Sequence, residues 1–319
     1  MFKANITRIA LAATLAFASH AALAQNTPVT IGMSGWTGFA PLTLAKEAGL
    51  FSKRGLDVTI KKIPQKDRHL ALASGDIQCA ATTVETWIVW TANGIPTTQI
   101  FQLDKSYGAD GMVVKPSIAK ISDLKGKTVA ASAPGTAPYF TLAWMLKKNG
   151  LSVKDVNVVN LEPQAAANAM IAGTANLDAA MTYEPYLSAV REKPEAGKII
   201  ATTLDYPMIM DTFGCTPKFL ADNPKAARAL ADAYFDALEM IKANPQKAFE
   251  IMGADVKQPA DKFEASQKNL RWQDRAANQK FFAGEHAEFS KEAAALLIEA
   301  GIIKQMPDMS KLADTQFIK

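Results

Sequence analysis

The sequence has few of the residues from which most metal centres and nucleophilic active sites are built. Its 319 residues include three histidines and two cysteines, namely His20, His69, His286, Cys79 and Cys215. The two histidines outside the N-terminal segment have no metal-ligand spacing with a carboxylate. The chain also lacks a Gly-x-Ser-x-Gly elbow and a Gly-x4-Gly-Lys-Ser/Thr phosphate loop. We therefore expect no metal, no cofactor and no catalytic residue.

Long apolar runs are missing beyond the N-terminal segment, and a membrane span needs roughly 18 or more apolar residues. The opening, MFKANITRIALAATLAFASHAALAQ, places Lys3 and Arg8 before an apolar stretch that ends in Ala22-Leu23-Ala24. This is the pattern of a cleavable signal peptide, which we assign to residues 1–24. The residue at the cleavage site, Gln25, is not a cysteine. We expect a periplasmic chain that starts near Gln25, carries no lipid anchor and does not span the membrane.

An excess of charge of one sign is also absent. Without Lys3 and Arg8, 33 of the 35 basic residues remain against 31 acidic ones. A nucleic-acid partner would need basic residues clustered on one face, and the sequence shows no such cluster. We expect no nucleic-acid partner.

The two cysteines, Cys79 and Cys215, lie far apart in the sequence. An oxidising compartment permits a disulfide between them. Two buried free thiols are the alternative, because the sequence alone does not place their Cα atoms at bonding distance.

Short β-branched runs alternate with helical patterns from VTIGM to PTTQIFQL, and a second such series runs from KTVAAS to KIIATT. This alternation predicts an α/β fold with mainly parallel sheets. After Pro217 the pattern is almost purely helical, with helix stops expected at Asn223-Pro224 and Asn244-Pro245. The two series resemble each other: GDIQCAATTVE (75–85) aligns with GTANLDAAMTYE (173–184) with one inserted residue. A duplicated lobe explains this match.

The segment SGWTGFAPLTLAKEAGLF places Trp36 in a bend between Gly35 and Gly38, behind a predicted strand. Ligands of open α/β sheets bind at the carboxyl ends of strands. Trp36 is therefore expected at the mouth of a cleft, where its indole could cover a small solute. Packing beneath its own loop is the alternative.

The segments WTGFAPLTLAKEAGLFSKRGLDV, LASGDIQCAATT, GADGMVV, ISDLKGKTVA and MTYEPYL resemble the nitrate/sulfonate/taurine class of periplasmic solute-binding proteins of ABC importers. This class shares its fold with the thiamine-pyrimidine synthases. The resemblance implies a two-lobed periplasmic binding protein of type II with two crossing strands, at 107–114 and 207–215, and a helical C-terminal portion. Lobe one would comprise residues 25–108 plus 212–319, and lobe two residues 109–211.

The strand-end loops supply the predicted ligand-binding residues, which are Ser34, Trp36, Thr37, Thr83, Glu85, Ser132, Gly135, Thr136, Tyr183, Glu184 and Asp211. The free N–H groups at 135 and 136 favour an anion. The acids Glu85, Glu184 and Asp211 favour a cation instead, because buried charges need compensation. Both glutamates could equally serve as helix N-terminal charges. A taurine-like zwitterion would satisfy both kinds of group.

The basic pair Arg68 and His69 could enter the cleft to serve an anion, although such residues more often cover a solvent face. The identity and charge of the solute stay open.

We interpret the chain as the monomeric solute-binding component of such an importer. It would capture a small nitrogen- or sulfur-containing solute by closing its two lobes and pass it to a membrane permease with its ATPase subunits. One alternative is the same scaffold binding a cationic or neutral nitrogen solute, such as guanidine, urea, an amine or a pyrimidine precursor. A thiamine-pyrimidine synthase-like enzyme is the other.

Overall fold

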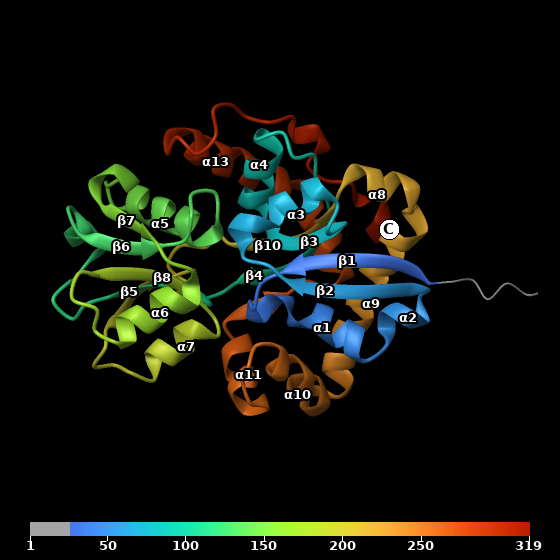
Figure 1. Ribbon diagram of the computed structural model, residues 1–319, viewed down its shortest axis with the longest axis horizontal. Helices are drawn as coiled ribbons and strands as arrows, with labels where there is room; N and C mark the ends of the chain where they lie inside the picture. The colour runs from blue at the N-terminus through green and yellow to red at the C-terminus, as the bar shows by residue number, and fades with distance from the viewer. Residues whose placement is uncertain (1–25) are drawn as a thin grey trace, which may run out of the picture.

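The computed structural model describes residues 26–319, so the predicted signal peptide, residues 1–24, lies outside the described residues. Within them the strands form a six-stranded and a five-stranded sheet, and the two sheets lie side by side with helices around each (Figure 1). We call the part built on the six-stranded sheet the first lobe and the part built on the five-stranded sheet the second lobe. The predicted two-lobed α/β fold is confirmed.

The six-stranded sheet has the order β11-β4-β10-β3-β1-β2. Its strands are β1 (Thr27–Met33), β2 (Leu56–Lys62), β3 (Cys79–Thr83), β4 (Thr98–Ser106), β10 (Met210–Cys215) and β11 (Leu270–Trp272). The helices of this lobe are α1 (Ala40–Glu47), α2 (Leu50–Lys53), α3 (Arg68–Ser74), α4 (Val84–Ala92), α8 (Pro217–Asp222), α9 (Pro224–Ala243), α10 (Pro245–Asp255), α11 (Ala260–Gln267), α12 (Arg275–Lys280) and α13 (His286–Glu299).

The five-stranded sheet has the order β7-β6-β8-β5-β9. Its strands are β5 (Asp110–Val114), β6 (Thr128–Ala131), β7 (Asn157–Asn160), β8 (Ala179–Tyr183) and β9 (Lys198–Thr202). The helices α5 (Ala137–Lys148), α6 (Pro163–Ile171) and α7 (Tyr186–Arg191) accompany this sheet (Figure 1).

Two connections join the lobes: residues 107–109 lead from β4 to β5, and residues 203–209 lead from β9 to β10. The Thr203 hydroxyl joins them, because it accepts from the Gly108 N–H at 2.8 Å and lies 2.6 Å from the hydroxyl of Ser106 at the end of β4. The strands next to these connections pair antiparallel, whereas β1-β2, β1-β3, β6-β7 and β6-β8 pair parallel. The sheets are therefore mixed rather than mainly parallel as predicted, because the strands beside the two connections run antiparallel to their neighbours. β10 pairs with the first sheet from Met210 onward, and the predicted lobe boundaries near 108 and 212 remain predictions.

Glycine and proline residues determine where several helices begin and end. α3 ends at Gly75, which takes a left-handed conformation with φ +81°, where glycine has no steric cost. α9 and α10 begin at Pro224 and Pro245, because proline tolerates the first turn of a helix but disrupts its interior. The predicted stops at these two prolines are confirmed.

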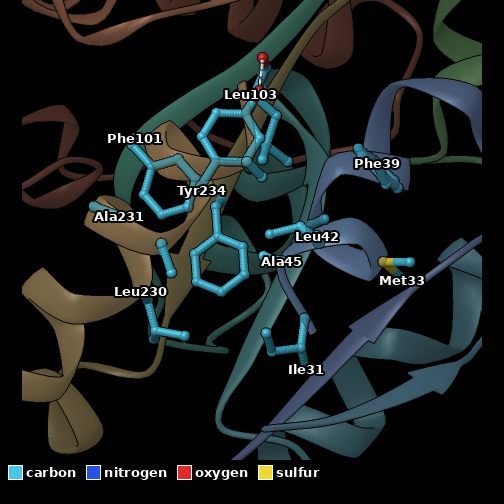
Figure 2. Packing of buried hydrophobic residues seen from close by; sticks show 14 of the residues in the cluster. Ile31, Met33, Phe39, Leu42, Ala45, Phe101, Leu103, Leu230, Ala231 and Tyr234 are labelled. Carbon is cyan, nitrogen blue, oxygen red and sulfur yellow. Dashed lines mark hydrogen bonds between the residues drawn. The ribbon is translucent and has the colours of Figure 1, made fainter. Parts of the chain in front are cut away.

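The apolar core of the first lobe lies between its sheet and the long helix α9. Figure 2 shows side chains of β1, α1, β4 and α9 meeting there, among them Ile31, Leu42, Phe101 and Tyr234. A second cluster crosses the lobe boundary, because α5 of the second lobe packs against α4 and α13 of the first. The two lobes therefore share one continuous apolar contact.

A disulfide joins Cys79 of β3 to Cys215 of the neighbouring strand β10. The disulfide lies inside the first lobe, so of the two alternatives left open by the sequence the structure shows the disulfide and not two free thiols.

Candidate functional site

A narrow cavity lies between the lobes, beside the two connecting segments. Its volume is about 20 Å³, which is room for roughly one water molecule. Its lining residues are Ser34, Trp36, Phe39, Gln65, Arg68, Thr83, Asp110, Ala137, Tyr183, Ile209 and Asp211. Both lobes contribute to the wall, and the wall combines aromatic rings with groups of both charge signs.

The residues predicted from the sequence divide into two sets. Those on the cavity wall are Ser34, Trp36, Thr83, Tyr183 and Asp211. Those that do not line it are Thr37, Glu85, Ser132, Gly135, Thr136 and Glu184. Whether any of them binds a solute remains a prediction.

Trp36 is held at the cavity by contacts with both lobes. Its side chain is buried, and its Nε1–H donates to both carboxylate oxygens of Asp104 at 3.3 and 3.4 Å. Its ring meets Tyr183 of the second lobe edge to face, with centroids 5.3 Å apart. A Cβ at Gly38 would lie 2.2 Å from both the Trp36 Nε1 and the Asp104 Oδ2. Glycine at position 38 is what makes room for the tryptophan.

Four buried acids gather around the cavity: Glu85, Asp104, Asp110 and Asp211. Asp104 and Asp211 stand opposite each other on β4 and β10, and their carboxyl groups hydrogen-bond. Two carboxyl groups in such contact cannot both ionise readily, so the pair shares a proton. Asp110 has one oxygen, Oδ2, that is buried without a protein partner among the described residues.

Burial disfavours the charged form of all four acids. It raises the pKa of Asp110 to about 7 and the pKa of Glu85 to about 8. It also raises the pKa of Asp104 to about 8. Burial, together with the neighbouring carboxylates, holds the pKa of Asp211 well above its usual range. At neutral pH this cluster can therefore give up protons when a positive charge arrives.

Arg68 is the cation of the cavity. Its side chain is 1 % exposed, its Nε donates to the Ile63 carbonyl at 2.9 Å and its Nη1 to the Ala81 carbonyl at 2.5 Å. Its Nη2 is buried and has no partner among the described residues. Burial lowers the Arg68 pKa to about 10, so the guanidinium stays charged at neutral pH. The structure thus places Arg68, one of the two basic residues considered for the cleft, on the cavity wall.

Glu184 is committed to other protein groups. Its carboxylate accepts from the guanidinium of Arg191, from the Ser188 N–H at 3.1 Å and from the Asn269 Nδ2 at 3.2 Å. Arg191 in turn donates to the Gly108 carbonyl in the first connecting segment at 3.0 Å. Through Arg191, the Glu184 carboxylate is therefore linked to the segment that joins the lobes.

The loop before α5 was expected to offer N–H groups to an anion. The Ala137 N–H at the start of the helix instead donates to the Gln65 side-chain oxygen at 3.1 Å. Ser132 donates to Glu162 at 2.8 Å. A side chain of the first lobe thus occupies this helix start.

Sequence reasoning missed several lining residues: Phe39, Gln65, Asp110, Ala137 and Ile209. Asp110 stands in GADGMVV, which was assigned only a crossing role. The position of an acid in a strand that crosses between lobes was the available signal. No sequence signal pointed to Gln65, because this residue lies in a short turn between β2 and α3 and not at the end of a strand.

A wider groove of about 710 Å³ separates the lobes beyond the cavity. α6 and α7 form one wall, and the segment from the end of α10 into α11 forms the other. Lys262 of α11 makes an ion pair with Glu192, at the end of α7, across this groove. Gly35 lines the groove rather than the cavity.

Within residues 26–319 no group of three or more histidine, cysteine or acidic side chains is arranged to hold a metal ion. The same part of the chain contains no helix with the length and apolar character of a membrane span.

Two α/β lobes joined by two connections, with a cavity at their boundary, define the fold of periplasmic binding proteins. A family model described as NMT1/THI5 like matches residues 36–248. The chain belongs to this family, and the resemblance found in the sequence is confirmed.

Similar proteins extend this result. The taurine-binding periplasmic protein of Escherichia coli is 29% identical over 248 residues, which are 75% of this chain and 73% of that protein. The alkanesulfonate-binding protein SsuA of Xanthomonas axonopodis pv. citri, solved bound to MOPS, has a TM-score of 0.78 at 17% identity and covers 91% of this chain and 99% of its own. The nitrate-binding protein NrtA of Synechocystis PCC 6803 has a TM-score of 0.64 at 19% identity, with 89% and 93% covered.

Proposed function

We propose that this protein binds a small zwitterionic solute, with a protonated amine and a sulfonate or carboxylate in the manner of taurine, between its two lobes. It delivers the solute to the permease and ATPase subunits of an ABC importer. Residues 1–24 export it to the periplasm, where it acts as a monomer. The names of its relatives as periplasmic taurine-, sulfonate- and nitrate-binding proteins support this placement.

One observation carries the choice of a zwitterion. Arg68 Nη2 and Asp110 Oδ2 both belong to the cavity wall, both are buried, and neither has a partner among the described residues. An unpartnered buried donor and an unpartnered buried acceptor each cost free energy. A solute with an anionic and a cationic end satisfies both at once, through charge-assisted hydrogen bonds.

The aromatic residues of the cavity wall also support a zwitterionic solute. Trp36, Phe39 and Tyr183 line the same cavity, and their rings suit the short apolar linker of such a solute as well as its ammonium group. The cavity of about 20 Å³ is smaller than taurine. The lobes must therefore stand further apart around a bound solute than they do here, as a hinge at the two connections allows.

A second candidate is a solute with a positive charge and no anion, such as guanidine or a simple amine. Its support is the surplus of acids, because Glu85, Asp104, Asp110 and Asp211 are buried around a cavity on whose wall the described residues place one basic side chain, Arg68. When such a cation binds, one or more of these carboxyls ionise to compensate it.

Calorimetric titration of the mature protein with three compounds of equal carbon skeleton separates the candidates. Taurine carries both charges, ethanesulfonate lacks the amine, and ethylamine lacks the sulfonate. We expect taurine to bind at least tenfold more tightly than either half, since each charged hydrogen bond is worth about 1.5 to 3 kcal/mol.

Equal binding of ethanesulfonate and taurine would contradict an amine subsite at Asp110. Tighter binding of ethylamine or guanidine would replace the zwitterion by the cationic candidate. The remaining alternative, a thiamine-pyrimidine synthase-like enzyme, requires chemical change of a bound compound. Mass spectrometry of each compound after incubation with the protein tests for it, and recovery of unchanged compound is expected.

A further inference from the structure

Gln65 connects the two lobes at the cavity wall. The residue belongs to the first lobe, in the turn between β2 and α3. Its side-chain Nε2 donates to the hydroxyls of Thr82 and Thr86 at 2.8 Å and lies 3.3 Å from that of Thr83. Its Oε1 accepts from the Ala137 N–H, the start of α5 in the second lobe, at 3.1 Å. One amide therefore spans the boundary between the lobes.

A second contact lies directly beside it. The Thr86 hydroxyl donates to the Gly135 carbonyl of the second lobe at 3.2 Å. Gly135 has φ +87°, and a Cβ there would lie 2.9 Å from Val89 Cγ1 on α4. The loop that precedes α5 can approach α4 this closely because residue 135 has no side chain.

From this geometry we infer that Gln65 is a positioning residue that holds the second lobe against the first and so sets the width of the solute cavity. Gln65 forms part of the cavity wall and at the same time binds the first N–H of a helix in the opposite lobe. A solute that moves the Gln65 amide would therefore also move α5, and with it change the distance between the lobes. This inference rests on the proposed closure of the lobes, but its test needs no solute.

The distance between the lobes can be measured by pulsed electron spin resonance with labels on Ala172→Cys and Ala221→Cys. Both alanines are exposed, one in each lobe. Gln65→Leu keeps the side-chain size but removes the hydrogen bonds to Ala137 and the threonines. Because a hydrogen bond contributes about 1 kcal/mol, we expect Gln65→Leu to lower the ratio of closed to open molecules about fivefold.

Gln65→Glu is the matched rescue variant. Its carboxylate still accepts from the Ala137 N–H, and the Thr82 hydroxyl can rotate to donate to it while the Thr86 hydroxyl keeps its bond to the Gly135 carbonyl. We expect its distance distribution to match the wild type. Identical distributions for the wild type and Gln65→Leu, or equal opening in Gln65→Leu and Gln65→Glu, would overturn the inference.

Gly135→Ala tests the same boundary from the second lobe, and it is available if Gln65→Leu does not fold. Its control is Gly126→Ala in the same lobe, where φ is +74° and a Cβ would meet nothing within 4 Å. Both variants carry the backbone strain of an alanine with positive φ. Only Gly135→Ala should widen the lobe separation, and equal distributions in the two variants would contradict the contact.

The outcome is separable from that of the solute proposal. If taurine, ethanesulfonate and ethylamine all fail to bind while Gln65→Leu still opens the lobes, the solute assignment is wrong and the role of Gln65 stands. If taurine binds but Gln65→Leu and the wild type show the same distance distribution, the solute assignment stands and the role of Gln65 is wrong.

Discussion

The two sides of the boundary between the lobes are built differently. On the α5 side, Phe140 and Trp144 of the second lobe pack against Phe289 of α13, with ring centroids 6.3 and 6.2 Å apart. On the α7 side an open groove of about 710 Å³ separates the lobes, bridged by the ion pair of Lys262 and Glu192. Burial of large apolar side chains stabilises far more than an exposed ion pair. We therefore expect the α5 side to hold the lobes together, and the groove to widen when they part.

Phe289→Ala is expected to have the largest effect, because it removes a buried ring from the apolar side of the boundary. Truncation of a buried phenylalanine costs about 3 kcal/mol of unfolding free energy or more. Chemical denaturation measures this loss. The control is Ile298→Ala on the same helix, whose side chain is 39 % exposed, and for which we expect about 0.5 kcal/mol. Equal losses in the two variants would show that the α5 side is not the stronger contact.

The acid cluster between the two sides predicts a dependence of stability on pH. The raised pKa values of Asp110, Asp104 and Glu85 mean that the folded protein keeps protons that the unfolded chain releases. Their stabilising contribution is complete below the unfolded pKa values and is lost as pH rises through about 7 to 8. His286 acts in the opposite direction, because burial lowers its pKa to about 4, but only below its unfolded value of about 6.5.

Between pH 6.5 and 8 the unfolding free energy should therefore fall with rising pH. Each acid that stays protonated contributes about 1.4 kcal/mol per pH unit. Asp211→Asn removes one titrating group and should give a shallower slope over the same range. Denaturation at a series of pH values checks both chains, and a flat wild-type curve would contradict the assignment of protonated acids.

Lys262→Ala should have the smallest effect, because it removes an ion pair whose two side chains are 52 % and 56 % exposed. A double-mutant cycle with Glu192→Ala should give a coupling of less than about 1 kcal/mol, which added salt weakens further. A salt-independent coupling of several kcal/mol would mean that the groove side holds the lobes as firmly as the α5 side.

Much of the fold was predictable because it follows from local rules. The alternation of strands and helices, the stops at Pro224 and Pro245 and the bend at Trp36 each depend on residues within one turn or strand. Trp36 lines the cavity because β1 ends beside it, and its contact with a solute remains a prediction.

The chemistry of the site was less predictable because its groups meet across long stretches of sequence. Trp36 and Asp104 are 68 residues apart, and Gln65 and Ala137 are 72 apart. Glu184 is the opposite case, because its main partner is close in the sequence. Its partner Arg191 follows seven residues later on the next helix, so the pairing was within reach of the sequence pattern.

We propose that one cavity holds a solute with two opposite charges, with its anion at Arg68 and its amine at Asp110. The most direct measurement is a crystal structure of the mature protein grown with taurine. We expect a sulfonate oxygen within hydrogen-bond distance of Arg68 Nη2 and the ammonium nitrogen within the same distance of Asp110 Oδ2. Taurine found only in the outer groove, or bound in the cavity with its sulfonate away from Arg68, would contradict the account.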